Sequence, residues 1–224
     1  MPGNFCCFMF NKLIFFLLLL ITTSFTASAQ YNWALKSDKD GIKIYTSPVA
    51  NSKLKALRIE CNYQSTLTQM VAALLDLKTR TEWIYHTKSI RLVKQVSPSE
   101  LFYYSEINLP WPAQNRDFVA HLITTQDENT KVVTMDGPVA PTMVPEKDGI
   151  VRVKNSISKW LIFPLNKHEV KVEYTIQLDP GGAIPAWLTN MFASEGPTQS
   201  FKALRLQLKK PEYRSASVPF IKNY

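Results

Sequence analysis

Residues 169–178 read EVKVEYTIQL, and apolar and polar side chains alternate along the whole stretch. The apolar side chains that share one face are Val170, Val172, Tyr174, Ile176 and Leu178. A period of two is typical of an antiparallel strand with one face on a core and the other in water. Gly181-Gly182 follows, so this stretch predicts the last strand of a sheet.

The segment after these glycines predicts a closing helix over residues 184–209. Pro185 suits the first turn of a helix. The apolar residues that recur at helical spacing are Trp187, Leu188, Met191, Phe192, Phe201, Leu204 and Leu208. Gly196-Pro197 is expected to kink or interrupt this helix, because proline lacks the backbone N–H and clashes with the preceding turn.

The chain before residue 169 predicts one helix among several strands. Ser65 or Thr66 can cap a helix whose apolar residues run from Leu67 to Leu75. Segments with alternating polarity, separated by turn-forming residues, predict strands. These segments are residues 42–45, 54–63, 89–96, 101–108, 117–125, 131–135 and 150–163. Such spacing indicates an antiparallel meander, so the predicted fold class is α+β.

Residues 1–29 are typical of a secretory signal peptide. Lys12 precedes the apolar run 13–21, and the segment ends in Ala27-Ser28-Ala29, a pattern of small residues before a cleavage site. The alternative is a membrane anchor, but this apolar run has roughly nine residues, whereas a spanning helix needs about 20. We therefore expect cleavage after Ala29 and export to the periplasm or the medium.

The rest of the chain predicts a single domain over residues 30–210, because no repeat or low-complexity linker divides it. Residues 211–224 follow the helix-ending Pro211 and are expected to form a poorly ordered tail. Cys61 is the only cysteine that remains after cleavage, so no intramolecular disulfide can form. It lies in an alternating strand and is expected to be a small core residue.

The charge of the chain favours anionic partners. The formal net charge is +8, and it falls to +7 when Lys12 is removed with the leader. This excess suits transient contact with an anionic membrane surface, although scattered Lys and Arg residues can also simply solvate a surface. Export argues against nucleic acid. His86, His121 and His168 are too far apart for a metal motif, and neither a metal nor a cofactor is expected.

Residues 137–149 interrupt the strand pattern. Pro138, Pro141 and Pro145 cannot donate to a sheet ladder, yet Met143 is apolar. An apolar loop outside regular structure needs something to cover. It is either a lid over a cavity mouth or a loop packed on the ordinary core.

Four strings, in this order, resemble the START family (steroidogenic acute regulatory protein-related lipid transfer). They are Trp33–Tyr45 with its DGIKIY turn and strand, Leu109–Val119 with Pro-Trp-Pro and then Arg-Asp, Pro145–Arg152, and Tyr174–Pro185. The resemblance covers about residues 33–208. It implies a helix-grip fold: a curved antiparallel sheet wraps a long C-terminal helix and encloses an apolar cavity.

The resemblance also implies that a single lipid, fatty acyl or sterol-like molecule lies in this cavity. The expected ligand-binding residues are Phe102, Tyr104, Glu106, Ala120, Leu122, Met143, Trp160, Tyr174, Trp187, Met191 and Phe192. Trp, Phe and Met side chains at helical spacing are usually core residues. In a helix-grip fold the two interpretations partly merge, because the tunnel lies between helix and sheet.

One departure from the family concerns Glu106. Sterol-binding members bury an acidic residue and an arginine on neighbouring strands, and Glu106 stands where the acidic residue is expected. Leu122 replaces the arginine, so the pair is broken and a sterol specificity does not carry over. Period two places Glu106 on one face with Phe102 and Tyr104, where it either contacts the ligand or is paired.

Arg116-Asp117 is the most prominent polar pair in the sequence. Adjacent residues of a strand point to opposite faces, so no catalytic dyad is expected. The structural alternative is an ion-paired strand junction that fixes the Trp111-Pro112 turn.

The predicted function is therefore binding of one apolar ligand, with transfer between membranes, by a monomer that is not an enzyme. The alternative is an enzyme of cyclase or hydrolase type on the same scaffold, acting on an apolar substrate. Glu106 and Tyr104 are its only conceivable acid/base couple.

Overall fold

The computed structural model describes residues 31–50, 55–182 and 191–223. The elements below all belong to one compact unit, Asn32–Tyr224. The expected signal peptide, residues 1–29, lies outside the described residues, and its cleavage stays a prediction.

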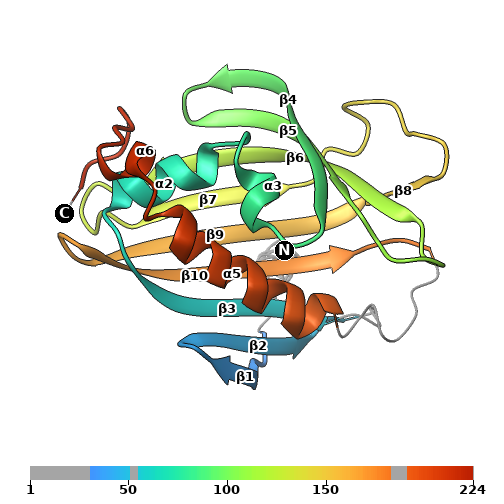
Figure 1. The fold of residues 1–224 in the computed structure, drawn as a ribbon, viewed down its shortest axis with the longest axis horizontal. Coiled ribbons are helices and arrows are strands. Elements are labelled where there is room, and N and C mark those ends of the chain that lie inside the picture. Colours follow the sequence, from blue (N-terminus) through green and yellow to red (C-terminus); the bar gives the residue numbers. More distant parts are fainter. Residues whose placement is uncertain (1–30, 51–54, 183–190, 224) are drawn as a thin grey trace, which may run out of the picture. The chain divides into compact units, whose positions relative to one another are not determined.

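A ten-stranded sheet forms the centre of this unit (Figure 1). The strand order is β1-β2-β3-β10-β9-β7-β6-β5-β4, and β8 pairs with β6. The bounds are β1 Ala34–Lys39, β2 Ile42–Pro48, β3 Lys55–Gln64, β4 Thr87–Ser97, β5 Glu100–Ile107, β6 Asn115–Gln126, β7 Val133–Pro138, β8 Ile150–Arg152, β9 Asn155–Asn166 and β10 Glu169–Asp179. All pairs along the order are antiparallel, and only the side pair of β6 and β8 is parallel.

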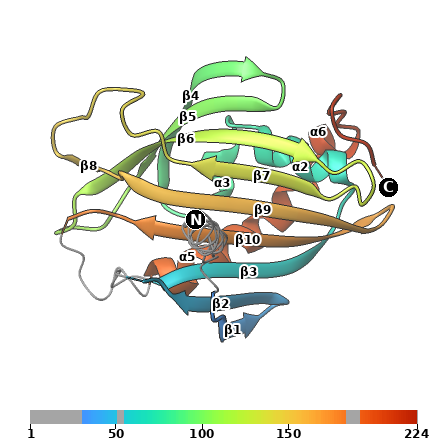
Figure 2. The same cartoon turned by 180° about the vertical axis from the view of Figure 1, so that it is seen from behind.

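The helices α2 (Leu67–Leu75), α3 (Arg80–Trp83) and α5 (Gly196–Gln207) cover one face of the sheet. The reverse view shows the other face of the sheet in front of them (Figure 2). We call the face under these helices the inner face and the opposite one the outer face. The predicted helix-grip architecture, a curved antiparallel sheet with a C-terminal helix across it, is confirmed.

The alternation in β10 determines which of its side chains lie on the inner face. Val170 and Val172 are fully buried in the core between sheet and helices, whereas Lys171 faces outward and pairs with Glu173. Helix α2 begins after Thr66, whose hydroxyl accepts a hydrogen bond from the Gln69 backbone N–H at 3.1 Å.

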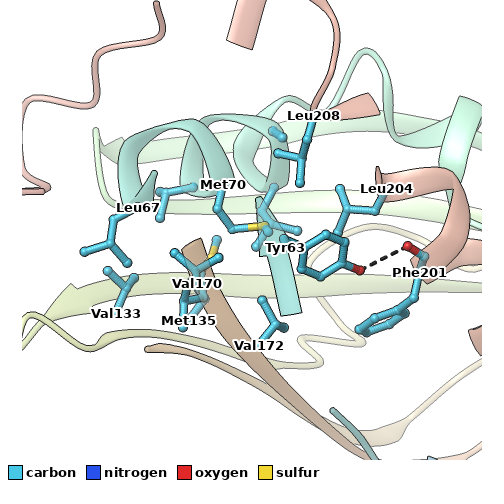
Figure 3. Packing of buried hydrophobic residues seen from close by; sticks show 14 of the residues in the cluster. Tyr63, Leu67, Met70, Val133, Met135, Val170, Val172, Phe201, Leu204 and Leu208 are labelled. Atoms are coloured by element: carbon cyan, nitrogen blue, oxygen red, sulfur yellow. Dashed lines mark hydrogen bonds between the residues drawn. The ribbon is translucent and has the colours of Figure 1, made fainter. Parts of the chain in front are cut away.

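Helix α5 adds the other side of this core. Phe201, Leu204 and Leu208 are buried. Figure 3 shows Leu208 near Met70 of α2, and Phe201 next to Tyr63. The Tyr63 hydroxyl of β3 donates a hydrogen bond to the Phe201 carbonyl at 3.1 Å. This bond ties the helix to the end of β3.

The single strand predicted over residues 150–163 is wrong. The segment forms two strands, because β8 runs parallel to β6 whereas β9 runs antiparallel to β7. Buried Val153 separates them, and its backbone N–H donates to the Asp117 carbonyl at 2.8 Å. The chain must turn there to change partners.

The predicted disorder of residues 211–224 is also wrong for the part that the structure describes. Pro211–Arg214 form the short helix α6, and Tyr213, Val218 and Ile221 are buried in the main core. The Asn223 side-chain oxygen accepts the Thr68 backbone N–H at 3.1 Å, at the start of α2. The tail is therefore part of the domain.

The structure describes the closing helix from residue 191 onward. A π-helical segment, η1 (Met191–Glu195), precedes α5, which begins at Gly196. The predicted irregularity at Gly196-Pro197 lies at this junction, as a missing proline N–H requires. Trp187 lies outside the described residues, as do the side chains of Met191 and Phe192. No helix of the described residues is long and apolar enough to cross a membrane.

Candidate functional site

The side chains of β5 that face inward are not the ones that the sequence predicted. Leu101 belongs to the core and Tyr103 packs against it. Phe102, Tyr104 and Glu106 therefore project from the outer face. The expectation that these three residues line the space beneath α5 is wrong. Aromatic residues occur at both inward and outward positions of β5, so the sequence pattern alone did not decide which of them face inward.

Glu106 is buried on the outer face and is paired. Its carboxylate accepts hydrogen bonds from Lys88 Nζ at 2.8 Å and from Asn115 Nδ2 at 2.9 Å, and Lys147 Nζ lies 3.8 Å away. The Lys88 ammonium lowers the pKa of Glu106, against the effect of burial, and Asn115 adds to the lowering. Glu106 and Tyr104 therefore do not reach a ligand held against the inner face, and the acid/base couple of the enzyme alternative is not placed for such a substrate.

This lowered pKa predicts how Glu106 affects stability with pH. Above the usual carboxyl pKa of 4.5, the ion pair stabilises the folded state, and this contribution is lost as the pH falls through the lower folded-state pKa. Glu106→Gln should reduce the free energy of unfolding by about 1 kcal/mol at neutral pH, since Lys88 is half exposed. In urea titrations the difference from wild type should shrink below about pH 4.5. A difference that persists unchanged to about pH 3 would contradict this assignment.

Asp117 pairs with Arg152 rather than with its neighbour Arg116. Arg152 Nε donates to Asp117 Oδ1 at 2.7 Å and Arg152 Nη2 to Oδ2 at 3.1 Å, with both side chains at most 1% exposed. The other guanidinium hydrogens bond the carbonyls of Pro141, Val144 and Pro145 at 2.5, 3.0 and 3.0 Å. The pair fixes residues 139–149, which we call the Pro-rich loop. An ion-paired strand junction was predicted at Asp117, and the structure shows that its cation is Arg152.

The Pro-rich loop covers the outer face of β5 and β6. Lys147 lies 4.5 Å from the ring centroid of Tyr104, and the Ala140 N–H donates to the Val119 carbonyl at 2.8 Å. Met143 is 38% exposed. These contacts place the loop over Tyr104 and Glu106 on the outer face. A role as a lid over a cavity mouth stays a prediction.

A cluster of polar side chains lies within the apolar inner face. Arg80 of α3 is 5% exposed, and its guanidinium lies 4.5 Å from the ring centroid of Tyr103. Arg80 Nε donates to the Leu74 carbonyl at 3.0 Å, at the end of α2. Burial raises the pKa of Tyr174, and Tyr103 adds to the rise, whereas Ser158 and Arg80 oppose it. Tyr174 lies opposite Trp160 in the β9–β10 pair, and Ser158 stands two residues before Trp160, so Tyr174 and Ser158 share the inner face with Tyr103 and Arg80.

Aromatic and aliphatic groups border this polar cluster. The ring centroid of Trp160 lies 4.4 Å from that of Tyr174 and 5.4 Å from that of Phe201. Ala120 and Leu122 of β6 share the inner face, opposite Tyr103 and Leu101. Of the predicted ligand residues, Trp160, Tyr174, Ala120 and Leu122 thus lie on the face that the helices cover. Such a surface can hydrogen-bond one polar group and bury an apolar chain beside it.

A groove of about 470 Å³ lies at the end of the sheet where β10 ends. Its lining comes from the end of β7, the start of β9 and the end of β10: Pro138, Val139, Lys154, Asn155, Ser156, Ile157, Gln177, Leu178 and Asp179. None of these residues belongs to the polar cluster around Arg80. Within the described residues, no group of three or more metal-ligating side chains occurs.

Sequence reasoning missed Arg80, Tyr103 and Ser158. Arg80 stands three residues before the buried Trp83, so helical spacing places both on one side of the chain. This spacing could have predicted that Arg80 is buried. It carries no information about whether Arg80 has an acidic partner. Tyr103 was missed because Tyr104, its neighbour, fits the alternation equally well.

The fold and this inner face define the class of protein. Residues 23–213 match the model of the START domain, and the chain belongs to this family. The predicted resemblance is confirmed.

Particular relatives support the assignment. An uncharacterized protein of Pseudomonas aeruginosa is 34% identical over 80% of this chain and 88% of its own length. The crystal structure of a STAR-related lipid transfer protein fragment from Xanthomonas axonopodis is similar at 30% identity. It has a TM-score of 0.73 and covers 80% of this chain and 99% of that one. The phosphatidylcholine transfer protein of Bos taurus is 28% identical over 73% of this chain and 78% of its own length.

Proposed function

We propose that this protein binds one amphiphilic lipid between the inner face and the helices that cover it. The observation that carries the proposal is the buried Arg80 guanidinium over the Tyr103 ring, with Tyr174 and Ser158 on the same, otherwise apolar inner face. A polar group bound there can hydrogen-bond these side chains, and the acyl part is buried at about 25 cal/mol per Å² of apolar surface.

The relatives support a lipid as the ligand. The bovine relative is a phosphatidylcholine transfer protein, and the Xanthomonas structure is that of a STAR-related lipid transfer protein. We propose that this chain likewise moves its lipid between membranes, as an exported monomer in the periplasm or the medium, without catalysing a reaction.

Contact with the membrane is assigned to the turn between β5 and β6. Trp111 in this turn is 92% exposed and stands between Pro110 and Pro112, which restrict the backbone. An exposed indole suits the interface of a bilayer, and the net positive charge, +8 for the full sequence and +7 without Lys12, favours an anionic one. The same end of the sheet carries the Gly181-Gly182 turn that leads into the closing segment.

Trp111→Ala is expected to weaken binding to anionic vesicles about tenfold, because the buried indole surface is lost. Leu165→Ala is the matched control, since Leu165 is 46% exposed at the opposite end of the sheet, beside the β9–β10 turn. Vesicle co-sedimentation measures both variants. Equal weakening by the two substitutions would count against this docking surface.

Native mass spectrometry tests the proposed function itself. The protein is expressed from its full-length coding sequence and purified without detergent in the form that the cell accumulates. A discrete added mass, released by organic solvent and identified as one lipid class, is the expected result. A protein that is empty and also takes up no lipid from vesicles would overturn the proposal.

A further inference from the structure

Arg116 places a second buried guanidinium on the inner face. Its neighbour Asp117 faces outward, and Arg116 pairs in register with Ile107 of β5. The residue is 5% exposed. Its Nη1 donates to the Gln114 carbonyl at 2.5 Å and its Nη2 to the Gly181 carbonyl at 3.2 Å. Arg116 Nε is buried and has no hydrogen-bond partner.

Within the described residues, no carboxylate forms an ion pair with either inner guanidinium. The ion pairs of the described residues include neither Arg80 nor Arg116. The remaining ranges, 1–30, 51–54, 183–190 and 224, contain no Asp or Glu in the sequence. The acidic side chains that are buried in strands β5 and β6, Glu106 and Asp117, project from the outer face and bind other cations.

Two unneutralised guanidinium groups within a largely apolar interior are unfavourable. Guanidinium stays protonated at any ordinary pH, so these charges cannot be removed by titration. Backbone carbonyls and the Tyr103 ring solvate them only in part, and desolvation lowers the pKa of Arg116 below its usual value. A buried charge of this kind is stabilised by a counter-ion. The interior therefore favours a ligand of opposite charge.

We propose that the cargo is a lipid whose polar part carries a net negative charge, and that Arg116, together with Arg80, selects for it. This inference rests on the proposed function and narrows its ligand class. The headgroup of a zwitterionic lipid carries a cationic group as well as a phosphate, and the described inner face offers no carboxylate for that cation. The headgroup of an anionic lipid such as phosphatidylglycerol carries only the negative charge of its phosphate.

The guanidinium groups of Arg80 and Arg116 lie at different places along the sheet. Tyr103, which lies under Arg80, and Ile107, which is opposite Arg116, are four residues apart on β5, or about 13 Å at the rise of a strand. A single unit charge at this distance, in the effective dielectric of a protein, still changes binding of an anion about tenfold. Each guanidinium is therefore expected to contribute separately to the selectivity.

A competition within one membrane tests the selectivity. The protein is incubated with mixed vesicles that contain equal amounts of phosphatidylglycerol and phosphatidylcholine with identical acyl chains. It is then recovered and weighed by native mass spectrometry. Because both lipids share one membrane, attraction of the protein to the vesicle surface does not bias the result. We expect phosphatidylglycerol adducts to exceed phosphatidylcholine adducts at least about tenfold.

Variants assign the selectivity to the interior. Arg116→Met should lower the phosphatidylglycerol preference about tenfold, and Arg116→Lys, which keeps the charge, should retain most of it. Arg214→Met is the matched control: Arg214 is exposed in α6, so this variant loses the same charge from the surface and should keep the full preference. Thermal unfolding of each variant confirms that it is folded.

The outcomes separate the two proposals. Normal loading with equal uptake of both lipids would overturn the anionic selectivity. An equal loss of preference in Arg116→Met and Arg214→Met would overturn its assignment to Arg116. Either outcome would leave the lipid-binding function standing. Excess inorganic phosphate should not displace the lipid, and displacement would overturn a lipid as the anion that the two guanidinium groups select. No uptake of any lipid would overturn the proposed function, and this inference with it.

Discussion

Asp117→Asn is expected to lower the free energy of unfolding by about 3–5 kcal/mol, because it leaves the fully buried Arg152 guanidinium without its counter-ion. The substitution keeps the shape of the side chain, so it removes the charge and little of the packing. The three loop carbonyls that Arg152 also binds cannot replace a carboxylate. Urea unfolding at neutral pH measures the loss.

An exposed ion pair provides the control for this prediction. Glu146 lies 3.0 Å from Lys154, and both side chains are more than half exposed. Glu146→Gln should therefore change stability by less than about 1 kcal/mol, since water and salt screen such a pair. Comparable losses of unfolding free energy in the two variants would show that burial does not account for the contribution of the Asp117–Arg152 pair to stability.

The second large effect is expected in helix α5. Leu204→Ala should reduce the free energy of unfolding by about 2–5 kcal/mol, because Leu204 is fully buried in the core and its removal leaves a cavity. Leu206 stands two residues further along the same helix and is 67% exposed. Leu206→Ala makes the same chemical change, in the same helix, without that cavity.

Chemical denaturation of the two variants should separate them clearly. We expect Leu206→Ala to lie within about 0.5 kcal/mol of wild type. Similar losses in both variants would mean that α5 does not present Leu204 to the sheet, and would contradict the helix-grip packing in which the inner face and the helix share one core.

The sequence predicted the elements whose patterns are unambiguous. Strand β10 alternates without exception, and its inward residues Val170 and Val172 were assigned correctly. The start of α2 was predicted because hydroxyl residues precede an apolar helical stretch, and of the two candidate caps, Ser65 and Thr66, the structure uses Thr66. In these cases a local pattern indicates the element directly.

The missed parts depend on contacts between distant segments. Residues 101–104 read LFYY, so either phase of β5 satisfies an alternating pattern, and only the pairing with β6 decides which face Tyr103 takes. The partner of Asp117 lies 35 residues away in β8, whereas the adjacent Arg116 points to the opposite face of the strand. Local spacing carries no information about such partners.

Packing of the tail against the core makes completion of the fold depend on segments that lie far apart in the chain. Strand β3 pairs with β10, and Ile221 enters the same core. A ribosome must therefore synthesise all the residues between Gln64 and Glu169 before β3 can find its partner. Such long-range pairing slows folding.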